Sequence, residues 1–263
     1  MNILLEIAGR TKERVEMRKK VLPLLHLMEM ARSSGIFDDF AFEKALRVKD
    51  IAFICEIKKA SPSKGIIAED FPYLDIAVDY EAAGAAAISV LTEPYYFKGD
   101  DRYLREVADI VSTPLLRKDF IVDNYMIYEA KILGASAVLL ICSILNQKTL
   151  AEYIGIAHSL GLSALVEVHD EDEVKIAVNA GARIIGVNNR NLKTFEVDTG
   201  ISIRLRKLVP GNIIFVSESG ICTAEDIDMM RKNGVGAVLV GEKLMRSPDK
   251  KKALADLRGG GHD

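Results

Sequence analysis

The sequence lacks the features that mark several common classes of protein. It has no tryptophan, and only 6% of its residues are aromatic. No run of about 18 apolar residues is present, so we expect no membrane-spanning helix. The first residues, MNILLEIAGRTKER, place Glu6 inside a short apolar stretch and offer no small-residue cleavage site, which is not typical of a secretory signal. We therefore expect a cytoplasmic protein.

Cysteine and histidine are also scarce. The three cysteines, Cys55, Cys142 and Cys222, form no Cys-x-x-Cys pair, and we expect buried thiols in a reducing compartment. The four histidines show no spacing typical of metal ligands. The sequence thus predicts no protein-bound metal.

An excess of charge of one sign is missing as well. The 35 basic and 38 acidic residues are interspersed and leave a net charge of −3, which argues against a general nucleic-acid binder. With 263 residues, 49% of them hydrophobic, the chain is long enough for a well-filled core and within the range of one α/β barrel.

What is present is a repeating unit, which begins at residue 51. Each unit has a short apolar run, a polar turn and an amphipathic stretch. Expected strands are 51–57, 86–91, 114–118, 136–141, 163–168, 183–188, 213–217 and 236–240. Expected helices are 72–83, 100–111, 124–132, 147–160, 171–180, 199–208, 223–232 and 248–257. Eight such units with nearly continuous apolar strands predict a parallel sheet that closes on itself, the (β/α)8 TIM barrel of the α/β class.

The alternative is a doubly wound open sheet. It would need a Gly-rich dinucleotide turn after an early strand, and the sequence has none. Residues 1–50 have a helical pattern, with Pro23 opening a second helix. We expect a single barrel domain over 1–263, with a helical extension at 1–50, the barrel at 51–257 and a flexible tail at 258–263. No helix face is apolar in excess, so a monomer is expected.

Polar residues stand at the ends of five of the apolar strands. A buried strand is normally apolar because a desolvated charge costs several kcal/mol unless it is paired. Residues two apart share a face, so an inward apolar residue such as Ile54 or Leu165 is followed by an inward polar one at the mouth. The spacing predicts a ring around one cavity, formed by Glu56, Lys58, Lys118, Glu167, Asn188 and Glu218.

Two interpretations of this ring remain open. Its members could hold perturbed pKa values suited to acid–base catalysis near neutral pH. The competing interpretation is a structural ion network that seals the barrel.

A second set of residues suits an anion. The loops after strands seven and eight, with the start of a short helix, are a recurrent phosphate site in barrels. Here these loops contain Gly220, Gly241 and Glu242, and Ser61 offers a hydroxyl from the loop after strand one. Backbone N–H groups would face the anion while the Glu242 side chain points away. Alternatively, the two glycines serve only tight turns.

A third set is apolar. Phe97, Phe120, Leu139 and Leu192 fall near strand ends, where they would form a wall for a flat, partly apolar ligand. Packing of loops onto the barrel helices explains each of them equally well when it is taken alone.

Taken together, these motifs resemble the indole-3-glycerol phosphate synthase family of tryptophan biosynthesis. The matching stretches are EIKKASPSKG at 56–65, LTEPYYFKG at 91–99, RKDFIV at 117–122, the Glu of LVEV, GVNNRNL at 186–192, SESGI at 217–221 and VGEKLMR at 240–246. The resemblance implies a (β/α)8 barrel that converts 1-(2-carboxyphenylamino)-1-deoxyribulose 5-phosphate to indole-3-glycerol phosphate, CO2 and water. It implies a carboxy-lyase with a small phosphosugar substrate and no cofactor.

The resemblance also implies roles for individual residues. Lys118 would be the principal general acid, oriented by Glu56, and Lys58 would hold the anthranilate carboxylate and act as a second candidate acid in the dehydration. Glu167 would be the general base and acid for loss of the hydroxyl. Asn188 and Glu218 would position sugar hydroxyls and the lysines. The implied phosphate ligands are Ser61, Ser219, Gly220, Gly241 and Glu242, and the implied ring pocket is Phe97, Phe120, Leu139, Leu192 and the stem of Arg190.

The sequence departs from the family pattern in one respect, and two other functions are alternatives to the synthase. The absence of tryptophan leaves only aliphatic side chains over Met1–Arg10 to cover the ring. Another phosphosugar barrel, such as a sugar isomerase, would pair a carboxylate or thiol acid with a carboxylate base where Lys and Glu stand here. A non-catalytic barrel would bind phosphosugars and leave them unchanged.

Overall fold

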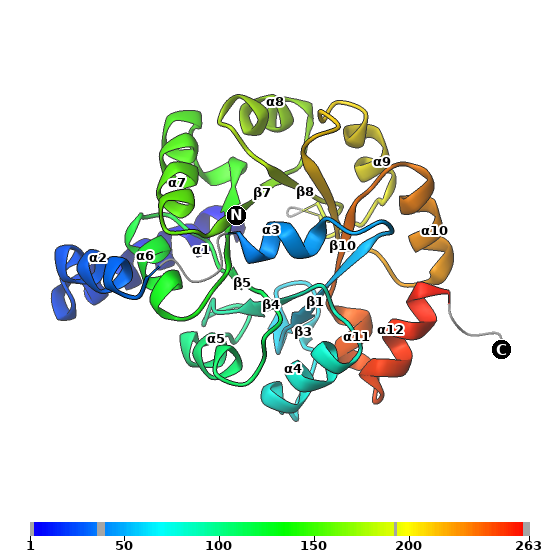
Figure 1. The fold of residues 1–263 in the computed structure, drawn as a ribbon, viewed down its shortest axis with the longest axis horizontal. Coiled ribbons are helices and arrows are strands. Elements are labelled where there is room, and N and C mark those ends of the chain that lie inside the picture. Colours follow the sequence, from blue (N-terminus) through cyan, green and yellow to red (C-terminus); the bar gives the residue numbers. More distant parts are fainter. Residues whose placement is uncertain (1–2, 36–39, 192–193, 260–263) are drawn as a thin grey trace.

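The computed structural model describes residues 3–35, 40–191 and 194–259, and within them eight parallel strands close into a barrel (Figure 1). The order around the barrel is β1, β4, β5, β6, β7, β8, β9 and β10, and β10 pairs back to β1. The strand bounds are β1 (Ala52–Ile57), β4 (Ala87–Leu91), β5 (Leu115–Lys118), β6 (Ala137–Ile141), β7 (Ser163–Val168), β8 (Ile184–Asn188), β9 (Ile214–Glu218) and β10 (Ala237–Val240). The closed barrel confirms the predicted fold and excludes the doubly wound sheet.

Most of the helices alternate with the strands and cover the outside of the barrel. Their bounds are α1 (Ile3–Val21), α2 (Leu24–Ser33), α3 (Ala41–Leu46), α4 (Tyr73–Ala82), α5 (Asp101–Ala108), α6 (Tyr125–Ile132), α7 (Gln147–Ser159), α8 (Glu171–Asn179), α9 (Gly200–Arg206), α10 (Ala224–Lys232), α11 (Glu242–Arg246) and α12 (Lys250–Arg258). Side chains of Asp100, Asn146 and Thr223 accept backbone N–H groups and fix the starts of α5, α7 and α10. The helical N-terminal region is confirmed.

Two short features escaped the sequence analysis. A hairpin of β2 (Ala60–Ser61) and β3 (Gly65–Ile66) follows β1, and a single 3-10 turn, η1 (Cys142–Ile144), follows β6. Both are too short to produce a periodic pattern of apolar residues. The predicted tail at 258–263 lies mostly outside the described residues.

Alternate residues of each strand feed two separate apolar cores. On β1, Ile54 points into the barrel interior, whereas Phe53 and Cys55 pack under the helices. The interior core also holds the residues expected beneath the polar strand ends, Leu116, Leu165 and Val216. Burial on both faces explains why the strands are almost continuously apolar.

Helix α3 closes the end of the barrel where the strands begin (Figure 1). Its Phe42 and Leu46 are buried in the interior core. The backbone N–H of Glu43 donates to Ser163 Oγ at the start of β7, and the Glu43 carboxylate pairs with Arg183 Nε at 2.8 Å. Because this end is filled, a ligand must enter at the opposite end, where the strands finish.

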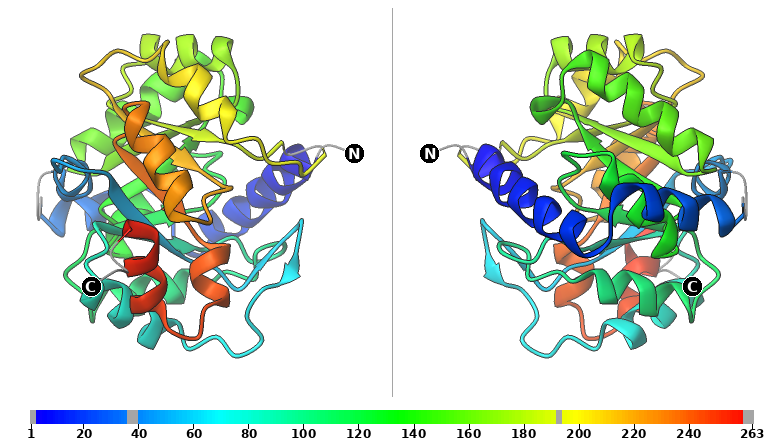
Figure 2. Two further views of the ribbon diagram at one scale, coloured as in Figure 1. Left: turned by 90° about the vertical axis from the view of Figure 1, so that its right-hand side faces the viewer. Right: turned by 90° about the vertical axis from the view of Figure 1, so that its left-hand side faces the viewer.

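Helix α1 lies at that opposite end (Figure 2). Arg14 on α1 pairs with Asp119, directly after β5, at 2.7 Å, and Lys19 pairs with Asp123 at 2.7 Å. These ion pairs hold α1 against the loop that follows Lys118.

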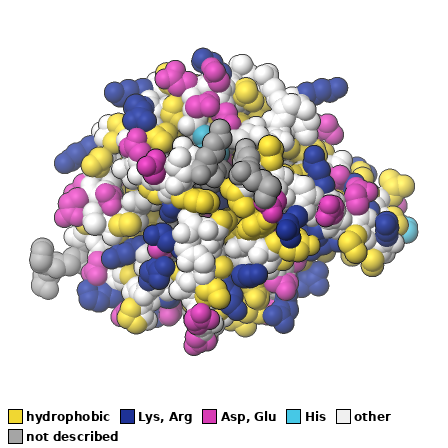
Figure 3. Space-filling view, turned by 180° about the vertical axis from the view of Figure 1, so that it is seen from behind, with side chains coloured by type: hydrophobic (Ala, Val, Ile, Leu, Met, Phe, Trp, Pro, Cys, Tyr) yellow, Lys and Arg dark blue, Asp and Glu magenta, His cyan; other side chains and the backbone are white. Residues whose placement is uncertain are grey.

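The face around the barrel mouth carries both signs of charge. Figure 3 shows Lys and Arg side chains interspersed with Asp and Glu side chains among hydrophobic patches. Neither sign forms one broad patch on the described part of this face, as the balanced composition predicted.

The cysteines differ in exposure. Cys55 and Cys142 are buried, but Cys222 is exposed, so the prediction of three buried thiols is wrong for Cys222. The reason is that Cys222 lies in the loop between β9 and α10 and not in a strand. Within the described ranges, no helix is both long and apolar enough to cross a membrane.

Candidate active site

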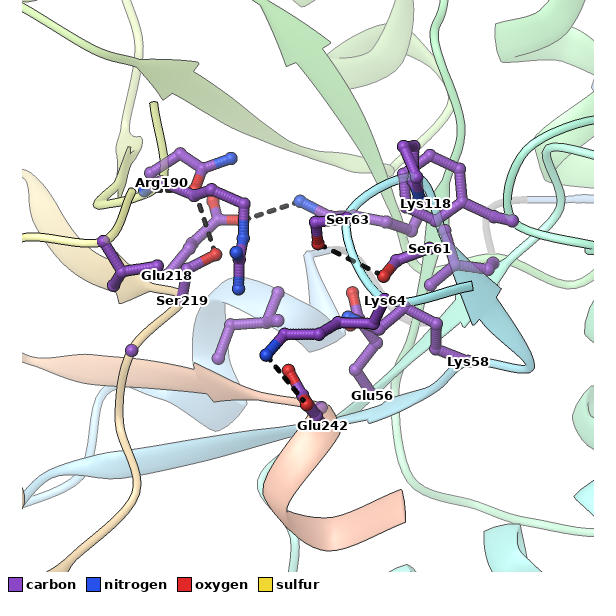
Figure 4. A pocket seen from close by; sticks show the side chains of 18 of the residues that line it. Glu56, Lys58, Ser61, Ser63, Lys64, Lys118, Arg190, Glu218, Ser219 and Glu242 are labelled. Atoms are coloured by element: carbon purple, nitrogen blue, oxygen red, sulfur yellow. Dashed lines mark hydrogen bonds and ion pairs between the residues drawn. The ribbon is translucent and has the colours of Figure 1, made fainter. Parts of the chain in front are cut away.

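The strand ends surround a cavity of about 900 Å³ at the barrel mouth (Figure 4). It brings together all six polar strand-end residues, Glu56, Lys58, Lys118, Glu167, Asn188 and Glu218. Every other described residue predicted for the site also lines it: Ser61, Phe97, Phe120, Leu139, Arg190, Ser219, Gly220, Gly241 and Glu242. Leu192 lies outside the described residues. Groups from all eight barrel strands and the loops that follow them therefore meet in one place.

Lys118 is the centre of an ionic cluster inside this cavity. Its Nζ lies 2.6 Å from Glu218 Oε2 and 3.2 Å from Glu167 Oε2. Burial alone would lower the pKa of Lys118, but Glu218, Glu167 and Glu56 outweigh burial and raise the pKa above its ordinary value. Lys118 is therefore held as an ammonium. The cluster does not lower the pKa of Lys118 toward neutrality.

The two carboxylates beside Lys118 have different environments. Burial and the charge of Glu167 raise the pKa of Glu218 against the opposing effect of Lys118. Glu218 Oε1 is buried and has no hydrogen-bond partner among the described residues. For Glu167, burial would raise the pKa, but Lys118 and His169 outweigh it and lower the pKa. The pair thus combines one firmly ionised carboxylate with one that takes a proton more readily.

Glu56 and Lys58 form a second ion pair, with Lys58 Nζ 2.5 Å from Glu56 Oε2. The sequence analysis expected Glu56 to orient Lys118; the direct hydrogen-bond partner of Glu56 is Lys58, and Glu56 acts on Lys118 through its charge. Both side chains pass close to Gly241, where a Cβ atom would meet Glu56 Oε2 and lie 3.1 Å from Lys58 Nζ. A side chain at position 241 would therefore displace the Glu56–Lys58 ion pair, which glycine leaves in place.

Asn188 links the carboxylate cluster to the loop after β9. Its Nδ2 donates to Glu167 Oε1 at 3.4 Å, and its Oδ1 accepts from Ser219 Oγ at 3.0 Å and from the Arg190 backbone N–H at 3.1 Å. The side chain of Arg190 donates in turn to the Phe195 carbonyl at 3.1 Å. Asn188 therefore fixes both the base of the 190s loop and the Ser219 hydroxyl.

One end of the cavity is lined by hydroxyls, glycines and cations. Ser61 Oγ and Ser63 Oγ lie 3.4 Å apart on the loop after β1. The Glu242 carboxylate pairs with Arg246 at 3.1 Å and with Lys64 at 3.7 Å, so its charge is engaged by cations (Figure 4). Sequence reasoning missed Ser63, Lys64 and Arg246, although SPSKG stood inside a motif it had singled out.

The other end of the cavity is apolar. The ring centroids of Phe97 and Phe120 lie 6.0 Å apart, and Leu139 lies on the adjoining wall. Helix α1 adds the aliphatic side chains Ile3, Leu4 and Ile7 to the cavity lining. The N-terminal segment thus covers part of the cavity without an aromatic residue. Walls of this kind suit a flat, partly apolar ligand.

Comparison with known proteins identifies the family to which this chain belongs. The family model described as indole-3-glycerol phosphate synthase matches residues 4–257. The chain is 61% identical to the "Indole-3-glycerol phosphate synthase" of Ruminiclostridium cellulolyticum over 257 residues, covering 98% of this chain and 99% of that protein. It is 52% identical to the protein of the same name from Endomicrobium trichonymphae, over 97% of this chain and 99% of that one.

Solved structures that resemble this one share its fold at low identity. The structure of 3-hexulose-6-phosphate synthase from Salmonella typhimurium matches with a TM-score of 0.65 at 15% identity, over 80% of this chain and 97% of that one. KGPDC from Streptococcus mutans matches with a TM-score of 0.63 at 10% identity, over 81% of this chain and 97% of that one. These likenesses concern the barrel alone. The family match decides against the isomerase and the non-catalytic barrel: the chain belongs to the indole-3-glycerol phosphate synthase family, carboxy-lyases of tryptophan biosynthesis.

Proposed function

We propose that this cavity converts 1-(2-carboxyphenylamino)-1-deoxyribulose 5-phosphate to indole-3-glycerol phosphate, with the strand-end charges performing the proton transfers. The observation that carries the proposal is the Lys118 ammonium, held between Glu167 and Glu218 within one cavity. The same cavity offers a hydroxyl-rich end for a phosphate and an apolar end for an aromatic ring.

Ring closure depends on an acid. The aryl carbon that bears the carboxylate attacks the sugar ketone, and Lys118 donates a proton to the ketone oxygen as negative charge develops there. The raised pKa of Lys118 keeps the proton in place until an alkoxide, a far stronger base, begins to form. Loss of CO2 then restores the aromatic ring.

Lys58 has a separate task in this scheme. Its ammonium binds the substrate carboxylate and then acts as the second acid, which protonates the leaving hydroxyl in the dehydration. Glu56 orients Lys58 through their 2.5 Å contact.

Glu167 is the proposed base. In the dehydration the hydroxyl leaves with a proton from an acid, and a second proton must leave the adjacent carbon–nitrogen unit as the double bond forms. The lowered pKa of Glu167 leaves it free to accept that proton. Asn188 and Glu218 orient Glu167 and Lys118 and accept hydrogen bonds from sugar hydroxyls.

The phosphate is proposed to bind at the hydroxyl-rich end. Its ligands would be the Ser61 and Ser219 hydroxyls and the backbone N–H groups of Gly220, Gly241 and Glu242. Binding so far from the reacting carbons holds the aryl ring over the ketone, because remote binding energy can be used for orientation. The ring would lie against Phe97, Phe120 and Leu139, with the Arg190 stem and Leu192 beside it.

The remaining expectations also stand as proposals. We propose a single barrel domain, a monomer without cofactor, and a cytoplasmic location, which a biosynthetic enzyme on a phosphorylated substrate would favour. The balanced surface charge supports a small-molecule substrate in preference to nucleic acid.

The test is conversion of the substrate by the purified chain, followed by indole fluorescence. The chain has no tryptophan, so product fluorescence rises without a protein background from indole side chains. Lys118→Ala should lower turnover by about 10²-fold or more, the scale of general acid catalysis. Lys59→Ala is the control, because Lys59 lies over the Phe71 ring, 5.9 Å from its centroid, outside the cavity lining. Near-normal turnover by Lys118→Ala would refute the assigned role.

A further inference from the structure

A second layer of polar side chains stands behind Glu167. His169 follows two residues after Glu167, where the chain leaves β7 for α8, and its Nε2 lies 3.4 Å from Glu167 Oε1. Lys118 Nζ faces the other oxygen of the same carboxylate at 3.2 Å. Glu167 thus lies between a lysine and a histidine, while Asn188 Nδ2 approaches Oε1 at 3.4 Å.

The opposite side of the His169 ring is held by α8 and η1. Nδ1 lies 3.0 Å from Glu173 Oε2, which also accepts the His169 backbone N–H at 2.8 Å. Ser143 Oγ donates to Glu173 Oε1 at 2.5 Å and lies 3.2 Å from Nδ1. The N-cap Asp170 accepts the Glu173 N–H at 2.9 Å and fixes the first turn of α8. Contacts from three elements therefore fix the ring and its direction.

This arrangement favours the imidazolium form of His169. Nδ1 lies at hydrogen-bond distance from Glu173, and Nε2 faces Glu167 at 3.4 Å without forming a hydrogen bond in this geometry. A carboxylate offers only acceptors and a negative charge, so its position beside each nitrogen favours a proton there. Burial would lower the pKa of His169, but the two carboxylates beside the ring, Glu167 and Glu173, outweigh burial and raise the pKa to about 10. In return, the cation opposes the burial of Glu167 and helps to lower the pKa of that carboxylate.

We propose that His169, clamped by Glu173 and Ser143, is a positioning residue that aims the Glu167 carboxylate and keeps it ionised for its work as base. The inference rests on the proposed role of Glu167. His169 is not among the described residues that line the cavity, so it acts through Glu167 and not by touching substrate. The other groups that face Glu167 are Lys118 from β5 and Asn188 from β8, with Glu218 from β9 repelling it across Lys118.

The competing explanation is a purely structural role, in which the His169–Glu173 pair only stabilises the loop between β7 and α8. A purely structural role predicts that loss of activity follows loss of stability at every pH. The positioning role predicts a loss that depends on pH, because removing a cation raises the pKa of Glu167 and leaves more of it protonated as the pH falls.

A first experiment observes the histidine without using activity. The chain has four histidines, so nitrogen-15 NMR of the intact protein, compared with His169→Asn, assigns the His169 signal. We expect His169 to keep both ring protons from pH 6 to pH 8, well above the ordinary histidine pKa of about 6.5. A neutral His169 ring at pH 7 would overturn the proposal.

A second experiment measures pH profiles of kcat and KM for His169→Asn and Glu173→Gln. We expect kcat to fall by about threefold or more with KM within about twofold, and the loss relative to the unaltered chain to be larger at pH 5 than at pH 8. The matched control is Glu171→Gln, which removes the same charge from an exposed position on the same turn of α8 and should leave the profile unchanged. The same profile for Glu171→Gln as for Glu173→Gln would overturn the proposal.

Two further outcomes separate this inference from the proposed function. If Glu167→Gln loses activity but His169→Asn keeps the unaltered pH profile, the positioning role is wrong and the base assignment stands. If Glu167→Gln keeps its activity, the base assignment is wrong and the positioning role falls with it. Should His169→Asn not fold, the Glu173→Gln profile with its Glu171→Gln control still decides the question.

Discussion

Arg117 and Lys118 are neighbours on β5, and the two cations have opposite surroundings. Arg117 points outward and is fully buried, donating to Asp101 at 2.8 Å, to Glu129 at 2.7 Å and to the Met126 carbonyl at 2.9 Å. Lys118 points inward to two carboxylates and an open cavity. Strand geometry alone separates them, because successive side chains leave opposite faces.

The difference is in what each cluster borders. The outer cluster extends to Arg18 and Arg14 on α1, and it joins the N-terminal helix to the barrel. The inner cluster leaves Glu218 Oε1 without a partner among the described residues and leaves Lys118 facing the cavity. Within the described part of the chain, each cluster has an unpartnered buried atom, Arg14 Nε in the outer one and Glu218 Oε1 in the inner one. A buried network enclosed by helices stabilises a fold, whereas one that lines a cavity is poised for a ligand.

The largest expected effect comes from removing the outer cation. Arg117→Ala should lower the free energy of unfolding by about 3–5 kcal/mol, because it leaves buried carboxylates without their partner. Lys118→Ala should cost clearly less, since Glu218 can take up a proton and neutralise itself beside the cavity. Chemical denaturation of both variants at pH 7 measures the comparison. Equal losses would show that the two clusters do not differ in kind.

A smaller effect is expected from the link between α1 and the barrel. Arg14→Ala removes the charged hydrogen bonds to the buried Asp119 and should lower the free energy of unfolding by about 1.5–3 kcal/mol. Arg10→Ala, on the same helix, removes a partly exposed pair with Glu6 and contacts with the Tyr95 and Tyr96 rings, and should change stability by about 1 kcal/mol or less. Denaturant midpoints of the two variants provide the measurement, and equal midpoints would argue against a structural role for the outer cluster.

The smallest effect concerns the pH dependence of stability. The folded-state pKa of Glu218 is raised, so the folded chain binds its proton more readily than the unfolded chain, and stability is lost as the pH rises from about 4.3 through the raised pKa. Glu218→Gln removes this loss. The variant should match the unaltered chain near pH 4 and exceed its free energy of unfolding by on the order of 1 kcal/mol at pH 8, while its turnover falls. The prediction is contradicted if Glu218→Gln loses stability relative to the unaltered chain as the pH rises from 4 to 8.

Much of the fold and of the cavity lining could be predicted from sequence, for a physical reason. The period of two along a strand fixes which residues face inward, so Ile54 below Glu56 and Leu165 below Glu167 follow from spacing alone. The closed parallel sheet then forces the strand ends to meet.

Pairing inside the cavity could not be predicted in the same way. Whether Glu56 contacts Lys58 or Lys118 depends on side-chain rotamers and on the radius of the barrel, which no spacing encodes. His169 was missed because a single histidine after a strand has no ligand spacing. The signals were its position two residues after Glu167 and four before Glu173 on the following helix.

The most direct test of the central claim is a crystal structure with indole-3-glycerol phosphate bound. We predict the phosphate beside Ser219, Gly220 and Gly241, and the indole ring between Phe97, Phe120 and Lys118. A product that binds outside this cavity, or one whose ring lies away from Lys118, would contradict the assignment of the inner cluster as the catalytic one.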